Sequence, residues 1–476
     1  MLQDVLIIIS QILFWPCFVY ALYLALLSLV SLISHKQKYE MQEDKQRFCI
    51  FVPSHNEEDI IAATVKNYSH INYNPALFDV YFLADNCNDE TASRARKAIA
   101  EVGMPNFHTL ERNVSDPDKQ GKAHALRWGM DLLEENGGFY SKYDMFVILD
   151  ADNFVDSDFL KHINSQYLSY KEKKRPAIIQ AYLDSKNKEN IISRGYFVAY
   201  RHTNGFLQLA KHKLHLTPCV VGTGFAISVP FLQRIGGYCC HSLVEDLEFE
   251  SITTLHGERI AYNQNVRIYD ERPTTFKDAT VQKIRWCQGH WWVFAHFAPR
   301  ILLHMLNPLE IRLFFRRLDN LIHLFASFLM LLSTLSLLWP VVMLCALQAF
   351  VVTVNPIVSL ISACSFAVII LFIPISSLMD GKREEKRRVL IDFIPNILAY
   401  SIHMVSYYIA NVIGLFRSGN QKVWLKTPHK VTSITYSADL EPEVAGIEEE
   451  TASAPKALSA SSEGAEASKG EKSAND

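Results

Sequence analysis

The sequence has little charge for its length and lacks the cysteine pairs that build disulfide or zinc folds. Charged residues make up 20% of its 476 residues, below the roughly 25% that is usual in soluble domains. The nine cysteines are odd in number, and none of them forms a CxxC pair. Neither a disulfide framework nor a cysteine zinc site is indicated, so we expect reduced thiols in a part of the chain that faces the cytoplasm.

A strongly basic surface is also missing. The net charge is −3, and residues 441–476 carry nine acids and three lysines, a net of −6, which leaves +3 for the other 440 residues. This balance argues against a nucleic-acid partner. Residues 441–476 contain no aromatic residue and are rich in alanine, serine, glutamate and lysine. Such a segment buries too little apolar surface to fold, so we expect a disordered acidic tail.

Long apolar runs are present instead. Residues 5–33 are 29 residues without a charge, whereas the apolar core of a secretory signal has about 7–15 residues. We therefore expect an uncleaved transmembrane anchor within residues 1–38. Three later runs predict about three spanning helices within residues 321–416. These runs are 321–352, 357–378 and 389–416.

Basic residues indicate the orientation of these spans. A basic cluster lies between the last two runs, which places that loop and residues 45–300 in the cytoplasm of a multi-pass protein. Basic residues also occur in a juxtamembrane segment at 417–440, directly after the last run, so the number of spans and the side of the C-terminus stay open. Residues 301–320 combine apolar and basic positions, which fits either interfacial amphipathic helices or an ordinary helix of the soluble domain.

Residues 45–300 alternate short apolar runs with helical patterns. Three of the runs, at 48–52, 80–84 and 145–149, each end at proline or aspartate. Strand, helix and strand at this spacing predict βαβ units and an α/β fold with a parallel sheet covered by helices. Ligands of such sheets bind beyond the carboxyl ends of the strands, where the polar residues lie in this sequence.

Asp150 and Asp152 directly follow the third run. Two carboxylates one residue apart can hold a divalent cation together with a diphosphate. An Asx turn or a helix cap would use the same residues. Pro53 and Glu57 belong to the polar turn after the first run, which a helix cap would also explain. Asp85 follows the second run in the same way. Lys122 opens a helical stretch where a phosphate can bind, although a surface turn would look the same.

Three further motifs lie downstream. Gly222 and Gly224 allow the backbone to approach a ligand, although a tight turn explains them equally well. Glu245-Asp246 can supply a general base, or simply begin a solvated helix. Gln282, Arg285 and Trp286 stand at i, i+3 and i+4, so in a helix they share one face. That face offers an amide, a guanidinium for phosphate and an aromatic platform for sugar; a helix end at the membrane interface explains the tryptophan alone.

Asp85, Asp150-Ala151-Asp152, Glu245-Asp246 and Gln282-Lys283-Ile284-Arg285-Trp286 together resemble the D, DxD, ED and QxxRW series of membrane-bound glycosyltransferase family 2. This family includes cellulose, chitin, hyaluronan and poly-N-acetylglucosamine synthases. The resemblance covers residues 45–300 and implies a GT-A-like, Rossmann-type nucleotide-sugar domain flanked by transmembrane helices. One departure is Val244, where many synthases have threonine.

The resemblance also implies residue roles. Asp246 is the expected catalytic base of a single inverting displacement, and Asp150 and Asp152 are expected to hold Mg²⁺ or Mn²⁺. The implied donor-binding residues are Pro53, Glu57, Asp85, Lys122, Asp150, Gln282 and Arg285. The implied acceptor-binding residues are Gly222, Gly224, Glu245 and Trp286.

Three functions are weighed. The first is synthesis of a β-linked polysaccharide at the plasma membrane from a cytoplasmic nucleotide sugar, such as a UDP-sugar, with possible export or co-synthesis partner proteins. The second is transfer of one or a few sugars to a lipid acceptor, which suits the small number of spans. The third is a silent nucleotide-sugar-binding scaffold, against which the intact carboxylates argue. Membrane lipids are expected partners of all three.

Overall fold

The computed structural model describes residues 2–33, 38–116, 119–335, 371, 374–375, 378 and 386–421. The predicted span at 357–378 therefore lies almost entirely outside the described residues. The second half of the run at 321–352, most of the segment 417–440 and the tail at 441–476 lie outside them as well.

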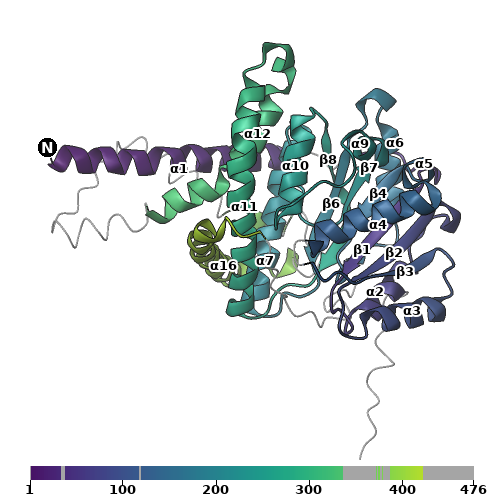
Figure 1. Ribbon diagram of the computed structural model, residues 1–476. Coiled ribbons are helices and arrows are strands. Elements are labelled where there is room, and N and C mark those ends of the chain that lie inside the picture. Colours follow the sequence, from purple (N-terminus) through teal and green to yellow (C-terminus); the bar gives the residue numbers. More distant parts are fainter. Residues whose placement is uncertain are drawn as a thin grey trace, which may run out of the picture. The chain divides into compact units, whose positions relative to one another are not determined.

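An eight-stranded sheet forms the centre of the α/β domain, with strand order β3-β2-β1-β4-β7-β6-β8-β5 (Figure 1). The three predicted strands are β1 (Phe48–Ser54), β2 (Phe78–Asp85) and β4 (Met145–Ile148). The strand β1 pairs in parallel with both β2 and β4, and β3 (Phe107–Arg112) extends this half of the sheet in parallel with β2. The prediction of βαβ units is confirmed for this half.

The other half of the sheet corrects the prediction of an all-parallel sheet. There β7 (Phe225–Ser228) runs antiparallel to both β4 and β6 (Ile178–Ser185). The strand β8 (Ile260–Asp270) is parallel to β6, and β5 (Phe154–Val155) is antiparallel to β8. The sheet is mixed because the chain reverses direction before β7, which then runs antiparallel along β4. The residues of β7 themselves contain no local pattern that predicts this reversal.

Side-chain alternation along β1 explains the layers on the two faces of the sheet. Phe48, Ile50 and Val52 face the cluster built with α2 (Ile61–Tyr68), α3 (Thr91–Val102) and α6 (Phe159–Ser169). Cys49 and Phe51 face the cluster on the opposite side. That cluster includes residues of α4 (Lys122–Gly137), α5 (Phe139–Lys142) and α9 (Val229–Arg234). The strand is apolar throughout because both of its faces are covered.

Helices form the third part of the structure. The chain passes from α7 (Ile191–His202) through a π-helical turn η4 (Thr203–Gln208) into α8 (Leu209–Lys213), and later from α10 (Glu245–Leu255) through β8 to α11 (Phe276–Met305). The helix α11 contains Gln282, Arg285 and Trp286, which confirms that this segment is helical. A 3₁₀ segment η5 (Pro308–Leu313) and α12 (Phe314–Leu324) follow.

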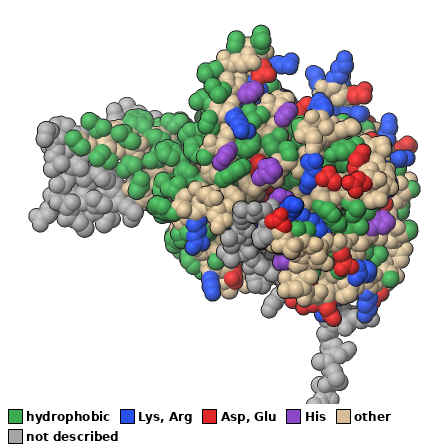
Figure 2. All heavy atoms as spheres, in the orientation of Figure 1, with side chains coloured by type: hydrophobic (Ala, Val, Ile, Leu, Met, Phe, Trp, Pro, Cys, Tyr) green, Lys and Arg blue, Asp and Glu red, His purple; other side chains and the backbone are tan. Residues whose placement is uncertain are grey.

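Among the described residues, two helices are long and apolar enough to cross a membrane. They are residues Gln11–Ile33 of α1 (Leu2–Ile33) and the whole of α16 (Val389–Arg417). A third candidate is a pair of helices, Pro308–Leu324 and Ala326–Leu335, bent by 46°. In the face shown in Figure 2, apolar side chains cover α1 and the α11–α12 region, whereas charged side chains gather over the sheet.

Candidate active site

The first wall of the site comes from the carboxyl ends of β1 and β2. Pro53 lies in β1 and Asp85 ends β2, and both line the same cavity. The Arg112 guanidinium donates to Asp85 Oδ1 at 2.9 Å. Burial raises the pKa of Asp85 although Arg112 favours its charged form.

A tight turn after β1 presents Glu57 to this wall. Asn56 has a φ of 56°, a left-handed conformation that asparagine tolerates better than most residues. Its side-chain oxygen accepts from Asn88 N at 2.9 Å, and Glu57 N donates to Thr91 Oγ1 at 2.7 Å. These bonds join the turns after the two strands, so the residues predicted to bind the donor nucleoside form one continuous edge.

The Asp150-Ala151-Asp152 segment follows β4 and is anchored by its own backbone. Asp150 N donates to Thr223 Oγ1 and to Asn153 Oδ1, each at 3.0 Å. The side chain of Asp152 is buried, and its Oδ2 accepts from Glu271 N at 3.2 Å. Asn153 N also donates to Asp150 O at 3.0 Å, so Asn153 closes this turn and both aspartates lie at the cavity wall.

Lys122 links the two acidic motifs. It begins α4, after Gly121, whose φ of 105° favours glycine. Its Nζ lies 2.7 Å from Asp150 Oδ1 and 3.1 Å from Glu245 Oε1, and it donates to Gly222 O at 2.7 Å. Burial alone would lower the pKa of Lys122, but the two carboxylates raise it above its usual value.

Glu245 and Asp246 form the first turn of α10, opposite Lys122. The expectation of a solvated helix start is wrong for Glu245, because its side chain is only 12% exposed and pairs with Lys122. Burial, together with the charge of Glu245, raises the pKa of Asp246 to about 7. Two adjacent carboxyl groups thus have different environments, the arrangement expected of a charged partner and a general base.

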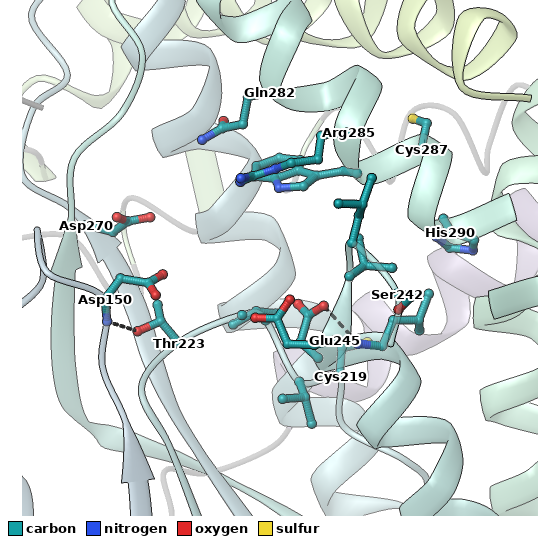
Figure 3. Close-up of a pocket in the computed structure, with 18 of the residues that line it drawn as sticks. Asp150, Cys219, Thr223, Ser242, Glu245, Asp270, Gln282, Arg285, Cys287 and His290 are labelled. Carbon is teal, nitrogen blue, oxygen red and sulfur yellow. Dashed lines mark hydrogen bonds between the residues drawn. The ribbon is translucent and has the colours of Figure 1, made fainter. Parts of the chain in front are cut away.

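The α11 face lies across the cavity from the acids. Figure 3 shows Gln282 and Arg285 on this helix, on the opposite side of the pocket from Asp150 and Asp270. Gln282 Oε1 accepts from Tyr196 OH at 2.9 Å. Trp286 lines the cavity beside Tyr407, with ring centroids 6.2 Å apart. All three motif residues therefore face the cavity.

One cavity of about 1140 Å³ brings nearly all the predicted residues together. Gly224 is not among the described residues that line it. A Cβ added to Gly224 would lie 1.8 Å from Ile268 Cδ1, and Gly224 O accepts from Ala181 N at 2.9 Å, so this glycine is packed into the sheet. The predicted residues that line the cavity are Pro53, Glu57, Asp85, Lys122, Asp150, Asp152, Gly222, Glu245, Asp246, Gln282, Arg285 and Trp286.

Sequence reasoning missed the acids after β8. Asp270 ends that strand and Glu271 follows it, and both line the cavity near the Asp150–Asp152 segment. Asn153 Nδ2 donates to Asp270 Oδ1 at 3.2 Å. An acid directly after a strand was the signal used for Asp85 and Asp150. The same signal does not identify Asp270, because the strand before it, IAYNQNVRIYD, has too many polar residues to be recognised as a strand.

The acids at this edge suit a hard divalent cation. Asp150, Asp152, Asp270 and Glu271 offer carboxylate oxygens, the ligands that Mg²⁺ and Mn²⁺ prefer. Burial raises the pKa of Asp150, and the charges of Asp270 and Glu245 add to this effect. Lys122 Nζ lies 2.7 Å from Asp150 Oδ1 and Arg272 Nη1 lies 2.6 Å from Asp270 Oδ2, so part of this negative charge is already offset. In their donor chemistry, the carboxylates present fit the predicted metal.

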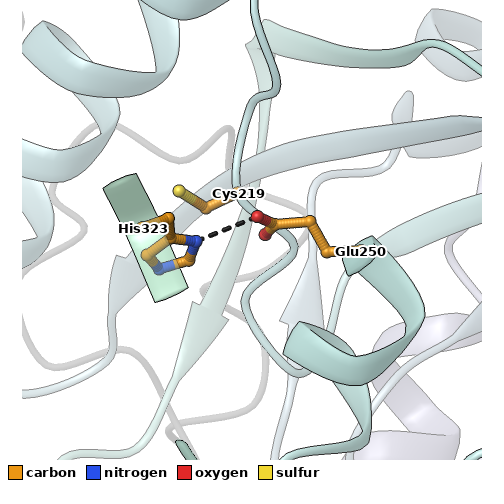
Figure 4. Close-up of side chains that lie close together, drawn as sticks. All are labelled: Cys219, Glu250 and His323. Atoms are coloured by element: carbon orange, nitrogen blue, oxygen red, sulfur yellow. Dashed lines mark hydrogen bonds and ion pairs between the residues drawn. The ribbon is translucent and has the colours of Figure 1, made fainter. Parts of the chain in front are cut away.

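A second group with metal-ligand chemistry lies deeper. Cys219, Glu250 and His323 offer atoms within 4.8 Å of one another (Figure 4). His323 Nδ1 lies 2.9 Å from Glu250 Oε1, and the Lys211 ammonium lies 3.6 Å from Cys219 Sγ. The ammonium would repel a cation at the sulfur. We therefore interpret this group as a buried network of ion pairs and hydrogen bonds.

Comparison with known proteins gives three informative relatives. Probable glycosyltransferase YdaM of Bacillus subtilis is 20% identical over 258 residues, 54% of this chain and 58% of that protein. Glucomannan 4-beta-mannosyltransferase 1 of Cyamopsis tetragonoloba is 22% identical over 283 residues, 58% of this chain and 51% of that protein. Beta-monoglucosyldiacylglycerol synthase of Trichormus variabilis is 24% identical over 256 residues, 54% of this chain and 51% of that protein. This chain thus spans about half the length of these relatives.

A solved structure supports the fold. Mannosyltransferase PcManGT from Pyrobaculum calidifontis, in complex with GDP-Man and Mn²⁺, superposes with a TM-score of 0.54 at 16% identity. The match covers 87% of this chain and 99% of that one. The predicted GT-A-like α/β fold is confirmed.

A family model covers the same part of the sequence. Residues 46–289 match the family described as "Glycosyltransferase like family 2". These are 244 of 476 residues, slightly more than half of the chain. The chain therefore belongs to glycosyltransferase-like family 2.

Proposed function

We propose that this protein is a membrane-bound, inverting glycosyltransferase of the synthase-like subtype, which transfers sugar from a nucleotide-sugar donor to a growing β-linked polysaccharide. The observation that carries this proposal is the single cavity in which the acids after β4, the Glu245–Asp246 pair and the α11 face meet. A nucleotide diphosphate, an acceptor hydroxyl and a sugar ring need these three kinds of group.

The donor is assigned to the wall formed by β1, β2 and β4. Pro53, Glu57 and Asp85 would contact the nucleoside, and the amide of Gln282 and guanidinium of Arg285 would close over the diphosphate. Asp150 and Asp152 would hold Mg²⁺ or Mn²⁺, which neutralises charge on a departing diphosphate. Manganese and GDP-Man accompany the PcManGT structure, and UDP-sugars remain the donors we expect from the motif series.

Asp246 is the proposed base. A carboxylate with a pKa near 7 can take the proton of an acceptor hydroxyl as the hydroxyl oxygen bonds to the anomeric carbon. The bond from that carbon to the diphosphate breaks on the opposite face, so an α-linked donor gives a β-linked product. Lys122 pairs with the neighbouring Glu245, so we assign the base role to Asp246.

The acceptor is assigned to the inner part of the cavity. Beyond Trp286, the lining includes aromatic rings from α16 and α1, and Gly222 keeps the wall open beside the base. A Cβ added to Gly222 would lie 3.5 Å from Asp246 Oδ2. Aromatic platforms suit sugar rings, and the glucomannan relative acts on such a polymer by its name. The inner aromatic residues are Tyr20, Tyr23, Tyr400 and Tyr407.

A glycolipid synthase is the second candidate. The same inner part of the cavity contains apolar side chains, among them Leu24, Ile322 and Met330, that would accommodate a lipid acceptor. The relative named beta-monoglucosyldiacylglycerol synthase carries such an activity by its name. Polysaccharide and glycolipid differ in the product, and both use the same donor chemistry.

Membrane attachment follows from the outer surfaces of the candidate spans. Ile12 and Val19 of α1, and Leu390 and Phe416 of α16, are large apolar side chains exposed to the surroundings. We propose that both helices cross the plasma membrane and that the sheet domain faces the cytoplasm, where nucleotide sugars are made. The apolar side chains around η5, such as Leu309, which is 89% exposed, support an interfacial position for residues 301–320.

The test is a donor panel. Washed membranes containing the protein are incubated with radiolabelled UDP- and GDP-sugars plus Mg²⁺ or Mn²⁺, and products are separated by size and by organic extraction. High-molecular-weight label that β-glycosidases release supports the polysaccharide proposal. Label in the organic phase supports the glycolipid candidate, and donor binding without any transfer would contradict both.

A further inference from the structure

The buried face of α16 is unusually close to the helix that carries the Gln-x-x-Arg-Trp residues. A Cβ added to Gly414 would lie 2.8 Å from Gln288 N of α11, and one added to Gly195 of α7 would lie 2.5 Å from Ala399 O. Small residues permit this approach, as they do between membrane helices generally. The candidate span α16 therefore packs directly against the wall of the active site.

Polar bonds fix α16 to α11 along its length. Lys283 Nζ donates to Ser406 Oγ at 2.6 Å, and Trp291 Nε1 donates to Asn411 Oδ1 at 3.1 Å. At the end of α16, Gln288 Nε2 donates to Asn420 O. The two helices are thus held in a fixed register, which also fixes the turn that follows α16.

That turn reaches residues 241–244, the loop directly before Glu245 and Asp246, which we call the acid loop. Gln421 Oε1 accepts from Leu243 N at 3.0 Å, and its Nε2 donates to Ser418 O at 2.8 Å and to Gln288 O at 3.4 Å. Leu243 lies two residues before Glu245, and Leu243 and Gln421 both line the cavity. One side chain therefore connects a membrane helix, α11 and the acid loop.

The acid loop is held at two points: His241 N and Ser242 N donate to Glu248 Oε2 of α10 at 2.8 and 2.7 Å, and Leu243 N donates to Gln421. Val244 is the N-cap residue of α10, and valine has no polar side chain to cap the helix. The helix α11 packs closely against the Val244 side chain, because a Cβ added to Gly289 would lie 2.7 Å from Val244 Cγ2. Glu245 and Asp246 form the next turn, so their direction follows the position of Leu243 and Val244.

We infer that the end of α16 is part of the active site and that Gln421 is a positioning residue, which holds the acid loop so that Asp246 faces the acceptor. This inference rests on the proposed function for the role of Asp246. It predicts that the soluble domain is incomplete without α16, although every recognised motif lies between residues 45 and 300. The bond to Leu243 N is the specific element that is tested.

The experiment compares isosteric and conservative variants of the full-length protein in lipid nanodiscs, with the donor identified by the panel. Gln421→Met removes the acceptor for Leu243 N, and we expect turnover to fall between about 10- and 100-fold, because a small displacement of a catalytic group costs this much. The donor KM and the binding of the matching nucleoside diphosphate with Mn²⁺ should stay within about twofold. Gln421→Glu keeps the acceptor oxygen for Leu243 N but loses the donor to Ser418 O and Gln288 O, so its turnover should lie between those of Gln421→Met and the wild type.

Two controls lie at the same helix end. Within the described residues, Ser418 Oγ donates to Leu415 O at 2.8 Å, a contact inside its own helix turn, so Ser418→Ala should behave as wild type. Gly414→Ala should lower turnover as Gln421→Met does. The second control is Gly419→Ala, which should leave turnover unchanged because nothing lies within 4 Å of the added Cβ. Wild-type turnover in Gln421→Met, or equal losses in Gly419→Ala, would overturn the inference.

Hydrogen exchange separates this inference from the proposed function. In Gln421→Met, the amides of residues 242–247 should exchange faster than in wild type and in Ser418→Ala, whether or not a donor has been found. Unchanged exchange there would overturn the positioning role. Faster exchange in a protein that transfers no sugar would instead retain the contact and contradict the assignment of Asp246 as a base.

Discussion

At the scale of single residues, the difference between Glu245 and Asp246 decides the chemistry. Asp246→Asn removes the proposed base and leaves the donor wall intact, so we expect turnover to fall about 10²- to 10⁴-fold. Nucleoside diphosphate binding, measured by calorimetry, should change less than twofold. Loss of that binding would show that Asp246 holds the donor instead.

The raised pKa of Asp246 predicts a pH dependence. A base works only when deprotonated, so kcat/KM should rise about tenfold per pH unit below pH 7 and level off above it. Burial and the charge of Glu245 cause the shift. Glu245→Gln should therefore move the rise to lower pH, and a rise that stays in place would refute the contribution of Glu245.

The acids after β4 give a metal prediction. Asp152→Asn should weaken donor binding in Mn²⁺ by about tenfold or more, and should leave the weak binding in EDTA unchanged. Asp131→Asn, which alters an exposed aspartate paired with Arg127 on α4, is the matched control. Equal Mn²⁺ dependence in both variants would exclude Asp152 as a ligand.

At the scale of elements, the start of β7 depends on Gly224, the residue directly before this strand. It has a φ of 65°, and an added Cβ would meet Ile268 in β8. Gly224→Ala should destabilise the fold by about 2–4 kcal/mol, from backbone strain and overpacking together. Thermal unfolding should show little change for Gly137→Ala, where nothing lies within 4 Å. Similar melting temperatures for the two variants would contradict this account.

At the scale of the whole molecule, the two candidate spans predict integral membrane behaviour. After alkaline carbonate washing the protein should remain in the membrane pellet, and only detergent should release it. Removing residues 1–38 should not free it, because α16 keeps an exposed apolar face that includes Leu398, Val405 and Ile409. Release of that variant by carbonate would show that α16 is not a span.

The sequence by itself determined the β1, β2 and β4 strands, the helix that opens at Lys122, and the residue types of the candidate site. These elements are local: apolar runs end at polar turns, and the hydrophobic period is set within about ten residues. The helical face of Gln282, Arg285 and Trp286 was predictable for the same reason. Residues 441–476, nearly all of the run 357–378 and the second half of the run 321–352 lie outside the residues that the structure describes.

Only the tertiary structure decided the rest. The antiparallel β7, the acids after the polar strand β8, the pairing of Lys122 with both Asp150 and Glu245, and the bond between Gln421 and Leu243 join residues far apart in the chain. The raised pKa of Asp246 arises from burial and a neighbouring charge. Such properties depend on which surfaces meet, and no local pattern records them, because burial and charge proximity exist only once the sheet and helices have packed.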